Sequence, residues 1–191
     1  MRYLAGVFLA VCCSATSFAS VCEYSAPEVR SLAYQKGAFL PVFFSGYQLD
    51  LPGVPFAFLS GDSFVAAYPE KGYIGVQHLD PVQMAESLPR LAKGLTSVAD
   101  FYRLIYGVST PLEASANPQE LSLQRSLLKL DCKSDTVFFD RDNIQIIFHG
   151  AADSADFHKI MVLDGNNVEL ITVRGRREVA LQVVGSIKRR L

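Results

Sequence analysis

The sequence predicts an α+β fold in which a mostly antiparallel sheet is covered by helices. Alternating apolar residues recur between residues 39 and 79 and again between residues 143 and 174, a pattern typical of strands with one covered face. Apolar residues at helical spacing occur in the middle of the chain and at its end. An α/β/α sandwich is one arrangement of this class.

The first 19 residues have the pattern of a cleaved signal peptide. Arg2 precedes an apolar run that extends from position 4 to position 13, and small residues flank Phe18 at the end of the segment. The apolar run covers about 10 residues, whereas a transmembrane helix needs roughly 20. We therefore expect residues 1–19 to be removed and residues 20–191 to form a single exported domain, periplasmic or secreted.

The charge balance excludes some classes of partner. The chain has 18 Lys and Arg residues, 19 Asp and Glu residues, and a formal net charge of −1. Nucleic-acid binding and attachment to anionic membranes both need clustered positive charge, which this balance disfavours. No apolar run after the signal is long enough to span a bilayer, so we expect no membrane span in the mature chain.

Two of the four cysteines, Cys22 and Cys132, lie outside the expected signal peptide. In an exported chain the simplest arrangement is one disulfide between them, and two buried free thiols are the alternative. Valine precedes Cys12 and Cys22, where a lipoprotein signal has a small residue, so cleavage without lipidation is expected.

The mature chain is expected to begin with a short helix. Ser25 and Glu28 have the spacing of a capping box, Pro27 suits the first turn, and Gly37 offers a left-handed stop. The buried stripe of this helix would consist of Val29, Leu32 and Ala33.

An aromatic region with five expected strands follows. The strands are residues 39–44, 47–51, 55–59, 63–67 and 73–79, separated by turns rich in Gly, Pro and Ser. The aromatic side chains fit either a sheet face buried under helices or an apolar ligand groove. The candidate binding residues are Phe43, Phe44, Tyr47, Phe56, Phe58 and Tyr73.

Helices are expected in the middle of the chain. One begins at Asp80-Pro81 and is interrupted at Pro89, and a second extends from a cap at Thr96 or Ser97 to residue 106, with Gly107 as its stop. Its inward residues would be Val98, Phe101 and Ile105. A third would begin at Asn117-Pro118 and reach about residue 130.

The last third of the chain has the clearest pattern. Strands are expected at 143–150, 157–163 and 168–174, with a tight hairpin turn at 164–167. A helix is then expected from Gly175 to the end, and Lys188, Arg189 and Arg190 would suit its C-terminal dipole. Its apolar stripe would contain Ala180, Val183, Val184, Ile187 and Leu191.

The segment VELITVRGRREVALQVVGSIK, residues 168–188, resembles the last strand and helix of Mog1/PsbP-like modules, including DcrB-type exported bacterial proteins. The matching pattern is a strand, a glycine and a helix that ends in Ser-Ile-Lys. The resemblance implies an α/β/α sandwich and a non-catalytic accessory role, and it assigns no functional residue.

The sequence contains no known nucleophile, zinc, phosphate-binding or calcium-binding motif, and we assign it no catalytic residue, metal ligand or cofactor. His149 and His158 lie on strands that are expected to be neighbours. An acid/base or metal site would combine them with the turn aspartates Asp140, Asp142, Asp153 and Asp156. Three arginines, Arg174, Arg176 and Arg177, form a corner that either binds an anion or is simply solvated.

These observations leave three functional hypotheses. The first is an exported, non-enzymatic accessory or binding protein that contacts another envelope protein or a small apolar ligand. The second is a small hydrolase or metal-dependent enzyme that uses His149, His158 and nearby aspartates, and it requires these side chains to converge in one pocket. The third is an inhibitor or immunity-type protein.

Overall fold

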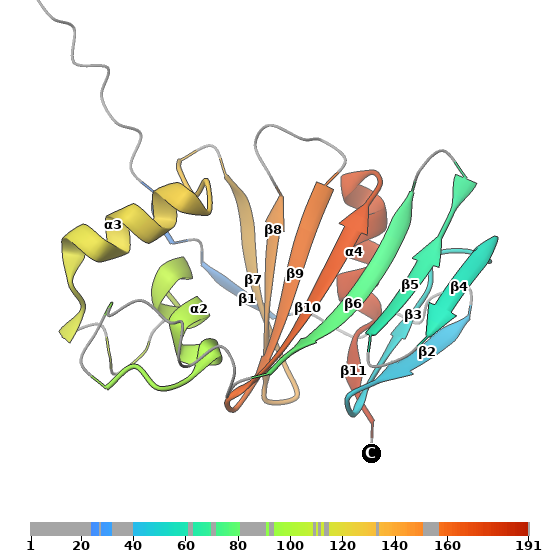
Figure 1. Ribbon diagram of the computed structural model, residues 1–191, viewed down its shortest axis with the longest axis horizontal. Helices are drawn as coiled ribbons and strands as arrows, with labels where there is room; N and C mark the ends of the chain where they lie inside the picture. The colour runs from blue at the N-terminus through green and yellow to red at the C-terminus, as the bar shows by residue number, and fades with distance from the viewer. Residues whose placement is uncertain are drawn as a thin grey trace, which may run out of the picture.

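The computed structural model has an α+β fold, as expected. In its described part, eleven strands form one eight-stranded and one three-stranded sheet; helices α2 (Val98–Tyr106) and α4 (Arg177–Ser186) pack against the strands, and α3 (Pro118–Leu127) packs against α2 (Figure 1). The described residues are 24–26, 28–31, 40–60, 63–69, 72–80, 91, 94–108, 110, 112, 115–132, 134–150 and 157–190.

The large sheet has the strand order β1-β7-β8-β9-β10-β6-β5-β4. All its neighbouring strands are antiparallel except β1 and β7, which are parallel. The strands are β1 (Val29–Ser31), β4 (Ala57–Ser60), β5 (Ser63–Ala67), β6 (Tyr73–Leu79), β7 (Asp135–Arg141), β8 (Ile144–Gly150), β9 (Phe157–Asp164) and β10 (Asn167–Arg174). The strands expected between residues 63 and 79 and between residues 143 and 174 are confirmed, whereas β7 lies in a stretch for which no strand was expected.

A small antiparallel sheet lies near the β4–β6 end of the large sheet (Figure 1). Its order is β11-β3-β2, with β2 at Pro41–Phe44, β3 at Tyr47–Asp50 and β11 at Lys188–Arg189. The strands expected over 39–44 and 47–51 are therefore confirmed, with slightly shorter bounds.

Two hydrophobic clusters lie on opposite faces of the large sheet. On the first face, which we call the α4 face, Ile146, Ile160 and Ile171 pack with residues of the small sheet and of helix α4 (Arg177–Ser186). On the other face, the α2 face, Ile147 and Met161 pack with residues of helix α2 (Val98–Tyr106). Because strand side chains alternate between faces, neighbouring residues such as Ile146 and Ile147 belong to different cores.

The described helices contact only part of the large sheet. α2 packs against β10 and also meets β8, where Tyr106 contacts His149, and α4 packs against β8 and β9. Residues 81–90, for which a helix was expected, lie outside the described residues. A sheet covered by helices across its whole width, as in an α/β/α sandwich, therefore stays a prediction.

The caps of α2 confirm the sequence pattern. The hydroxyl oxygen of Ser97 accepts the backbone N–H of Asp100 at 3.0 Å, and Gly107 ends the helix with a φ of 70°. The expected inward residues Val98, Phe101 and Ile105 are all buried. Helix α3 (Pro118–Leu127) begins at the expected cap, where the side chain of Asn117 accepts two backbone N–H groups, and ends slightly before residue 130.

The first described strand corrects one expectation. Residues 29–31 form β1, parallel to β7, where a helix was expected, and Val29 is exposed rather than buried. The capping pattern around Ser25 supplies only local hydrogen bonds, whereas pairing with β7 satisfies the backbone of this segment at the edge of the sheet. Leu32, Ala33 and Gly37 lie outside the described residues.

The end of the chain requires a second correction, because α4 stops at Ser186 and does not continue to Leu191. The guanidinium of Arg141, on β7, donates to the carbonyl oxygens of Gly185, at 3.0 Å, and Ile187. These bonds satisfy acceptors that a longer helix would have used itself. Lys188 and Arg189 then pair with β3 as β11, so they do not complement a helix dipole as expected.

Candidate functional site

The six aromatic residues predicted from the sequence do not share one environment. Phe43, on β2, and Phe58, on β4, are 53% and 43% exposed, and Phe56, just before β4, is 71% exposed. Phe44 and Tyr73 are half-buried. Tyr47 is a core residue, and its hydroxyl donates to the Asp164 carboxylate at 2.6 Å.

Three phenylalanines join the small sheet to the end of the large sheet. The rings of Phe58 and Phe64 are stacked with centroids 5.5 Å apart, and the ring of Phe44 meets Phe64 edge-on at 6.1 Å. Phe64, on β5, was not among the six candidate residues. It lies opposite Val76 on β6, so the alternation of β5 directs it to the same face as the core residues of the sheet.

A cavity of about 260 Å³ lies beside this aromatic cluster, between β2, β4, β5, β6 and β10. Its apolar lining includes the three phenylalanines, and its polar lining includes His78 and Glu169. The cavity therefore combines aromatic walls with an ionisable pair.

Glu169 is the most unusual residue of this cavity. Its exposed fraction is 1%, and one carboxyl oxygen, Oε1, lies 2.7 Å from His78 Nδ1. The other oxygen, Oε2, is buried and has no hydrogen-bond partner in the described part of the chain. A buried acceptor without a partner destabilises a fold by about 1–3 kcal/mol, so such groups commonly bind a ligand or an ordered water.

The alternation of side chains in β10 is the sequence signal that indicates the burial of Glu169. Within β10, Glu169 alternates in phase with Ile171 and Val173, both of which are buried on the α4 face. A charged residue in phase with the buried positions of a strand indicates a buried charge and hence a specific partner.

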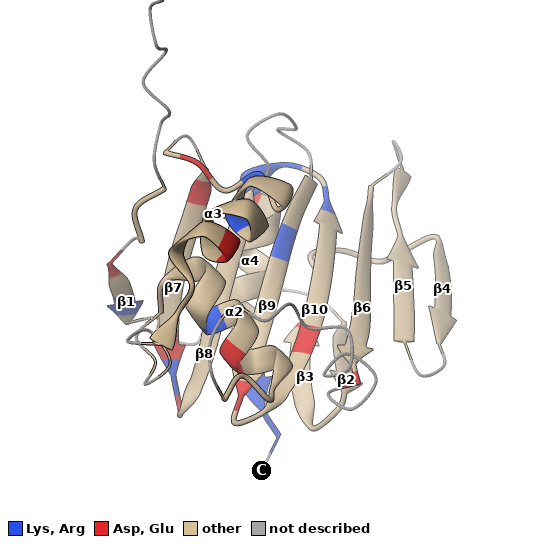
Figure 2. Cartoon of the chain, turned by 60° about the vertical axis from the view of Figure 1, so that its left-hand side comes forward, with Lys and Arg blue, Asp and Glu red and all other residues tan. Residues whose placement is uncertain are grey.

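β4 forms one edge of the large sheet and carries no charged residue. All four residues from Ala57 to Ser60 are exposed, and β4 pairs with β5 on one side only in the strand order of the described residues. Figure 2 accordingly shows β4 and β5 in tan along their whole length, without Lys, Arg, Asp or Glu. Exposed edge strands usually carry charges or proline that prevent pairing with other chains, and β4 lacks both.

The two strand histidines lie on opposite faces of the large sheet. His149 pairs with Lys159 and Gly150 pairs with His158, so the two rings belong to alternate positions of the same ladder. The His149 ring contacts Tyr106 of α2, whereas the His158 ring stacks on Phe148 of the α4 face. They do not converge in one pocket as the enzyme hypothesis required.

The surroundings of His149 are those of a core residue. Its Nδ1 lies 3.3 Å from the hydroxyl oxygen of Thr136 on β7. Burial, with a smaller effect of the positive charge of Lys159, lowers the pKa of His149 to about 4. The imidazole is thus neutral at neutral pH.

The expected acidic partners of the histidines do not complete a metal site in the described residues. Asp153 and Asp156 lie outside the described part, and Asp140 and Asp142 line a different cavity. Within the described residues, no group of three or more His, Cys, Asp or Glu side chains has an arrangement that would hold a metal ion.

No protein-family model matches the chain, and no curated protein matches it.

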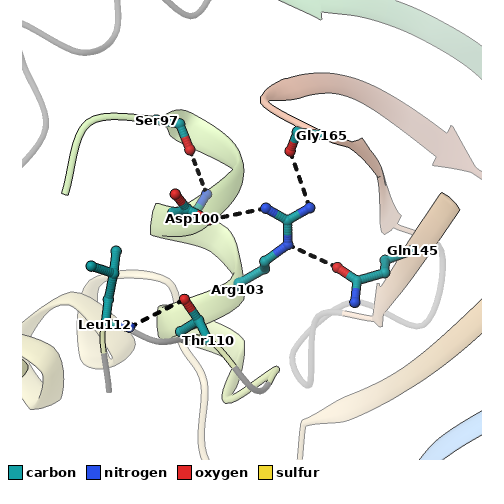
Figure 3. Close-up of polar contacts among 7 residues, drawn as sticks. All are labelled: Ser97, Asp100, Arg103, Thr110, Leu112, Gln145 and Gly165. Atoms are coloured by element: carbon teal, nitrogen blue, oxygen red, sulfur yellow. Dashed lines mark hydrogen bonds and ion pairs between the residues drawn. The ribbon is translucent and has the colours of Figure 1, made fainter. Parts of the chain in front are cut away.

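A polar cavity of about 670 Å³ is lined by Asp100 and Arg103 of α2 together with residues of β7, β8 and β9. The Arg103 guanidinium donates to Asp100 at 3.0 Å, Gln145 at 2.8 Å and the carbonyl oxygen of Gly165 at 3.1 Å (Figure 3). These contacts connect α2 with β8 and with the turn between β9 and β10. Since the guanidinium already has three partners, we assign it a structural role.

The arginine corner at the start of α4 is divided between two environments. Arg177 pairs with Asp135 on β7, and its guanidinium lies over the ring of Phe148, 5.5 Å from the centroid. The exposed residues Arg174 and Arg176 line a cavity of about 440 Å³ together with Tyr68 and Pro69. The described residues contain no buried polar group that would select an anion here, so we assign no ligand to this corner.

The expected disulfide is not described, because Cys22 lies outside the described residues. Cys132 lies five positions after Leu127, the last residue of α3. No helix in the described ranges has the length and apolar character needed to cross a membrane.

Proposed function

We propose that this protein is an exported, non-enzymatic binding protein of the cell envelope that pairs its β4 edge with an extended segment of a partner protein. The observation that carries this proposal is the uncharged edge strand β4, whose four residues are all exposed. An extended segment that adds to a sheet edge gains main-chain hydrogen bonds, and side-chain pockets beside the edge supply specificity.

The side chains around the edge support a protein partner. Phe58 and Leu59 are adjacent in β4 and therefore point to opposite faces of the sheet, and Leu59 is 71% exposed. Val54 and Phe56, which precede the strand, add further exposed apolar surface. A strand bound at β4 would contact apolar side chains on both of its faces.

The other hypotheses have less support. The enzyme hypothesis needed His149 and His158 in one pocket, and they lie on opposite faces of the sheet. An inhibitor would use the same edge, but no described feature distinguishes it from an accessory protein. The resemblance to Mog1/PsbP-like modules is consistent with an accessory role and remains part of the proposal.

Photocrosslinking from the β4 edge tests this function. When p-benzoylphenylalanine replaces Phe56 in the cells that naturally make this protein, we expect a discrete adduct with one envelope protein. The same probe at Leu127 is the matched control, because Leu127 is similarly exposed, at 68%, but lies on α3. Adducts of the same kind from both positions, or none from either, would count against the proposal.

A charge on the edge provides the second arm of the test. Leu59→Lys places a positive charge in β4 while leaving the buried residues of β5 unchanged, so it should remove the Phe56 adduct without unfolding the protein. The thermal unfolding midpoint of the variant checks that the fold is retained. A retained adduct in the folded variant would rule out strand pairing at β4.

A further inference from the structure

The aromatic cavity contains a carboxyl group that lacks a partner. Glu169 Oε1 is held by His78 Nδ1 at 2.7 Å, whereas Oε2 is buried and has no hydrogen-bond partner among the described residues. The same cavity of about 260 Å³ is lined by Glu169 and His78. A group that donates a hydrogen bond to Oε2 from within the cavity would therefore complete the site.

The walls of the cavity favour a cation over a neutral donor. Phe44, Phe58 and Phe64 line it, and the rings of Phe44 and Phe58 both contact that of Phe64. The faces of aromatic rings carry negative electrostatic potential and attract ammonium groups. A carboxyl group and aromatic rings that line one small space both favour positive charge, and both disfavour an anion.

We propose that this cavity binds the ammonium group of a small primary alkylamine. One ammonium N–H donates to Glu169 Oε2, the alkyl chain lies against the phenylalanine rings, and Ser60, which also lines the cavity, supplies a hydroxyl oxygen for a second N–H group. Phe58 and Ser60 belong both to β4 and to the wall of the cavity, but amine binding does not require a strand paired at the β4 edge.

The size and chemistry of the cavity define the ligand class. A volume of about 260 Å³ is just below the range of roughly 300–1,000 Å³ that is usual for drug-sized ligands, so a short alkyl chain is expected. A quaternary ammonium ion has no N–H to donate to Oε2. An alcohol of the same length has a donor but no charge.

Isothermal titration calorimetry of the full mature protein tests the proposal, with n-butylammonium as the probe. Tetramethylammonium and 1-butanol are the comparison ligands. We expect n-butylammonium to bind at least about tenfold more tightly than either, because it alone offers both the charge and the N–H donor. Absence of n-butylammonium binding at about 10 mM would overturn the proposal and indicate that Oε2 is satisfied by water alone. Equal affinity for the three compounds would also overturn it.

Variants assign the binding to Glu169. Glu169→Gln keeps the shape of the side chain and removes its charge, and we expect at least a tenfold loss of n-butylammonium affinity, roughly. Glu178→Gln, on the exposed start of α4, is the matched control and should bind as the wild type does. Unchanged affinity in Glu169→Gln would overturn the proposal. Phe58→Leu, which removes a partly exposed ring, gives a second test if Glu169→Gln does not fold, with a loss of about threefold expected and an unchanged affinity contradicting the site.

A lysine side chain of another protein carries the same alkylammonium group as a free amine. Nα-acetyl-lysine methylamide, titrated in parallel, distinguishes the two sources. Binding of n-butylammonium but not of the lysine derivative supports a free amine, as proposed, whereas tighter binding of the lysine derivative overturns the small-molecule assignment. The crosslinking experiment tests only strand pairing at β4, and these titrations test only amine binding. A negative result in one experiment therefore leaves the other proposal standing.

Discussion

Gly107, which ends α2, lies directly against Ala26 of the N-terminal segment. A Cβ atom added to Gly107 would be 2.7 Å from the Cβ atom of Ala26, a separation that real Cβ atoms do not show. The backbone of Gly107 also has a positive φ of 70°. Glycine at this position therefore permits both the helix stop and the close approach of residues 24–26.

Gly107→Ala should lower the free energy of unfolding by about 3 kcal/mol, because backbone strain and steric overlap both contribute. Gly165→Ala is the control. Gly165 also has a positive φ, 57°, but no neighbouring atom lies within 4 Å of its added Cβ, so about 1 kcal/mol is expected from strain alone. Urea unfolding measures both values, and equal losses would show that Ala26 does not restrict position 107.

Arg141→Met should destabilise the protein by about 3 kcal/mol. The substitution leaves the carbonyl oxygens of Gly185 and Ile187 without the donor that now satisfies them at the end of α4. Arg174→Met, an exposed arginine on β10, should change the free energy of unfolding by no more than about 0.5 kcal/mol. Chemical denaturation of both variants at one pH makes the comparison, and similar values would mean that Arg141 contributes little.

The free energy of unfolding should decrease as the pH is lowered, because His149 titrates at different pH values in the folded and unfolded chains. Because burial lowers its pKa to about 4, the unfolded chain takes up a proton near pH 6.5 while the folded chain remains neutral there. The contribution of neutral His149 is complete above about pH 6.5 and is lost as the pH falls toward 4, an effect of about 3 kcal/mol.

His149→Gln removes this titration and retains a polar side chain opposite Thr136. The difference in unfolding free energy between the wild type and this variant should therefore shift against the wild type between about pH 7 and pH 4.5. Denaturant titrations at several pH values measure it. Parallel pH dependence in the two proteins would contradict the proposed cause.

The disulfide between Cys22 and Cys132 remains a prediction, and the neighbouring residues support it. The hydroxyl of Tyr24 donates to the Tyr106 carbonyl oxygen at 3.1 Å, and the Arg125 guanidinium lies 5.3 Å from the centroid of the Tyr24 ring. The N-terminal segment thus lies at the ends of α2 and α3, and Cys132 follows α3.

Peptide mapping without reduction should recover Cys22 and Cys132 in one linked peptide pair. Cys22→Ser should lower the free energy of unfolding by up to about 4.7 kcal/mol, because the bond would close a loop of about 110 residues in the unfolded chain. Quantitative alkylation of two thiols in the native, unreduced protein would exclude the bond.

Local signals predicted the parts of the fold whose hydrogen bonds are local. Ser97 and Gly107 cap α2, and Asn117 caps α3, through contacts made within a few residues. The turn at 164–167 joins β9 and β10 as expected. Such elements depend on side chains that are neighbours in sequence, so their pattern can be read directly.

The pairing of distant segments was not predictable in the same way. β1 pairs with β7, and β11 pairs with β3, in both cases where a helix was expected. The register of β8 and β9 also decides that His149 and His158 face opposite sides, and the segment between these strands carries no pattern that fixes it. The cavity beside Glu169 is formed by residues of β2, β4 and β6, which are far from β10 in the sequence. No single stretch of sequence therefore predicts it.

The hydroxyl oxygen of Ser186 accepts the backbone N–H of Asp50 at 3.0 Å across 136 positions of the chain. Together with the pairing of β11 and β3, this contact means that the small sheet is completed only when residues 186–189 have reached it. Folds with many such distant contacts form slowly, because loop closure precedes the gain from each contact. The hairpin of β2 and β3, which carries Phe43 and Phe44, therefore stays without its third strand until residues 186–189 pair with it, and an unpaired strand edge of this kind is prone to aggregation.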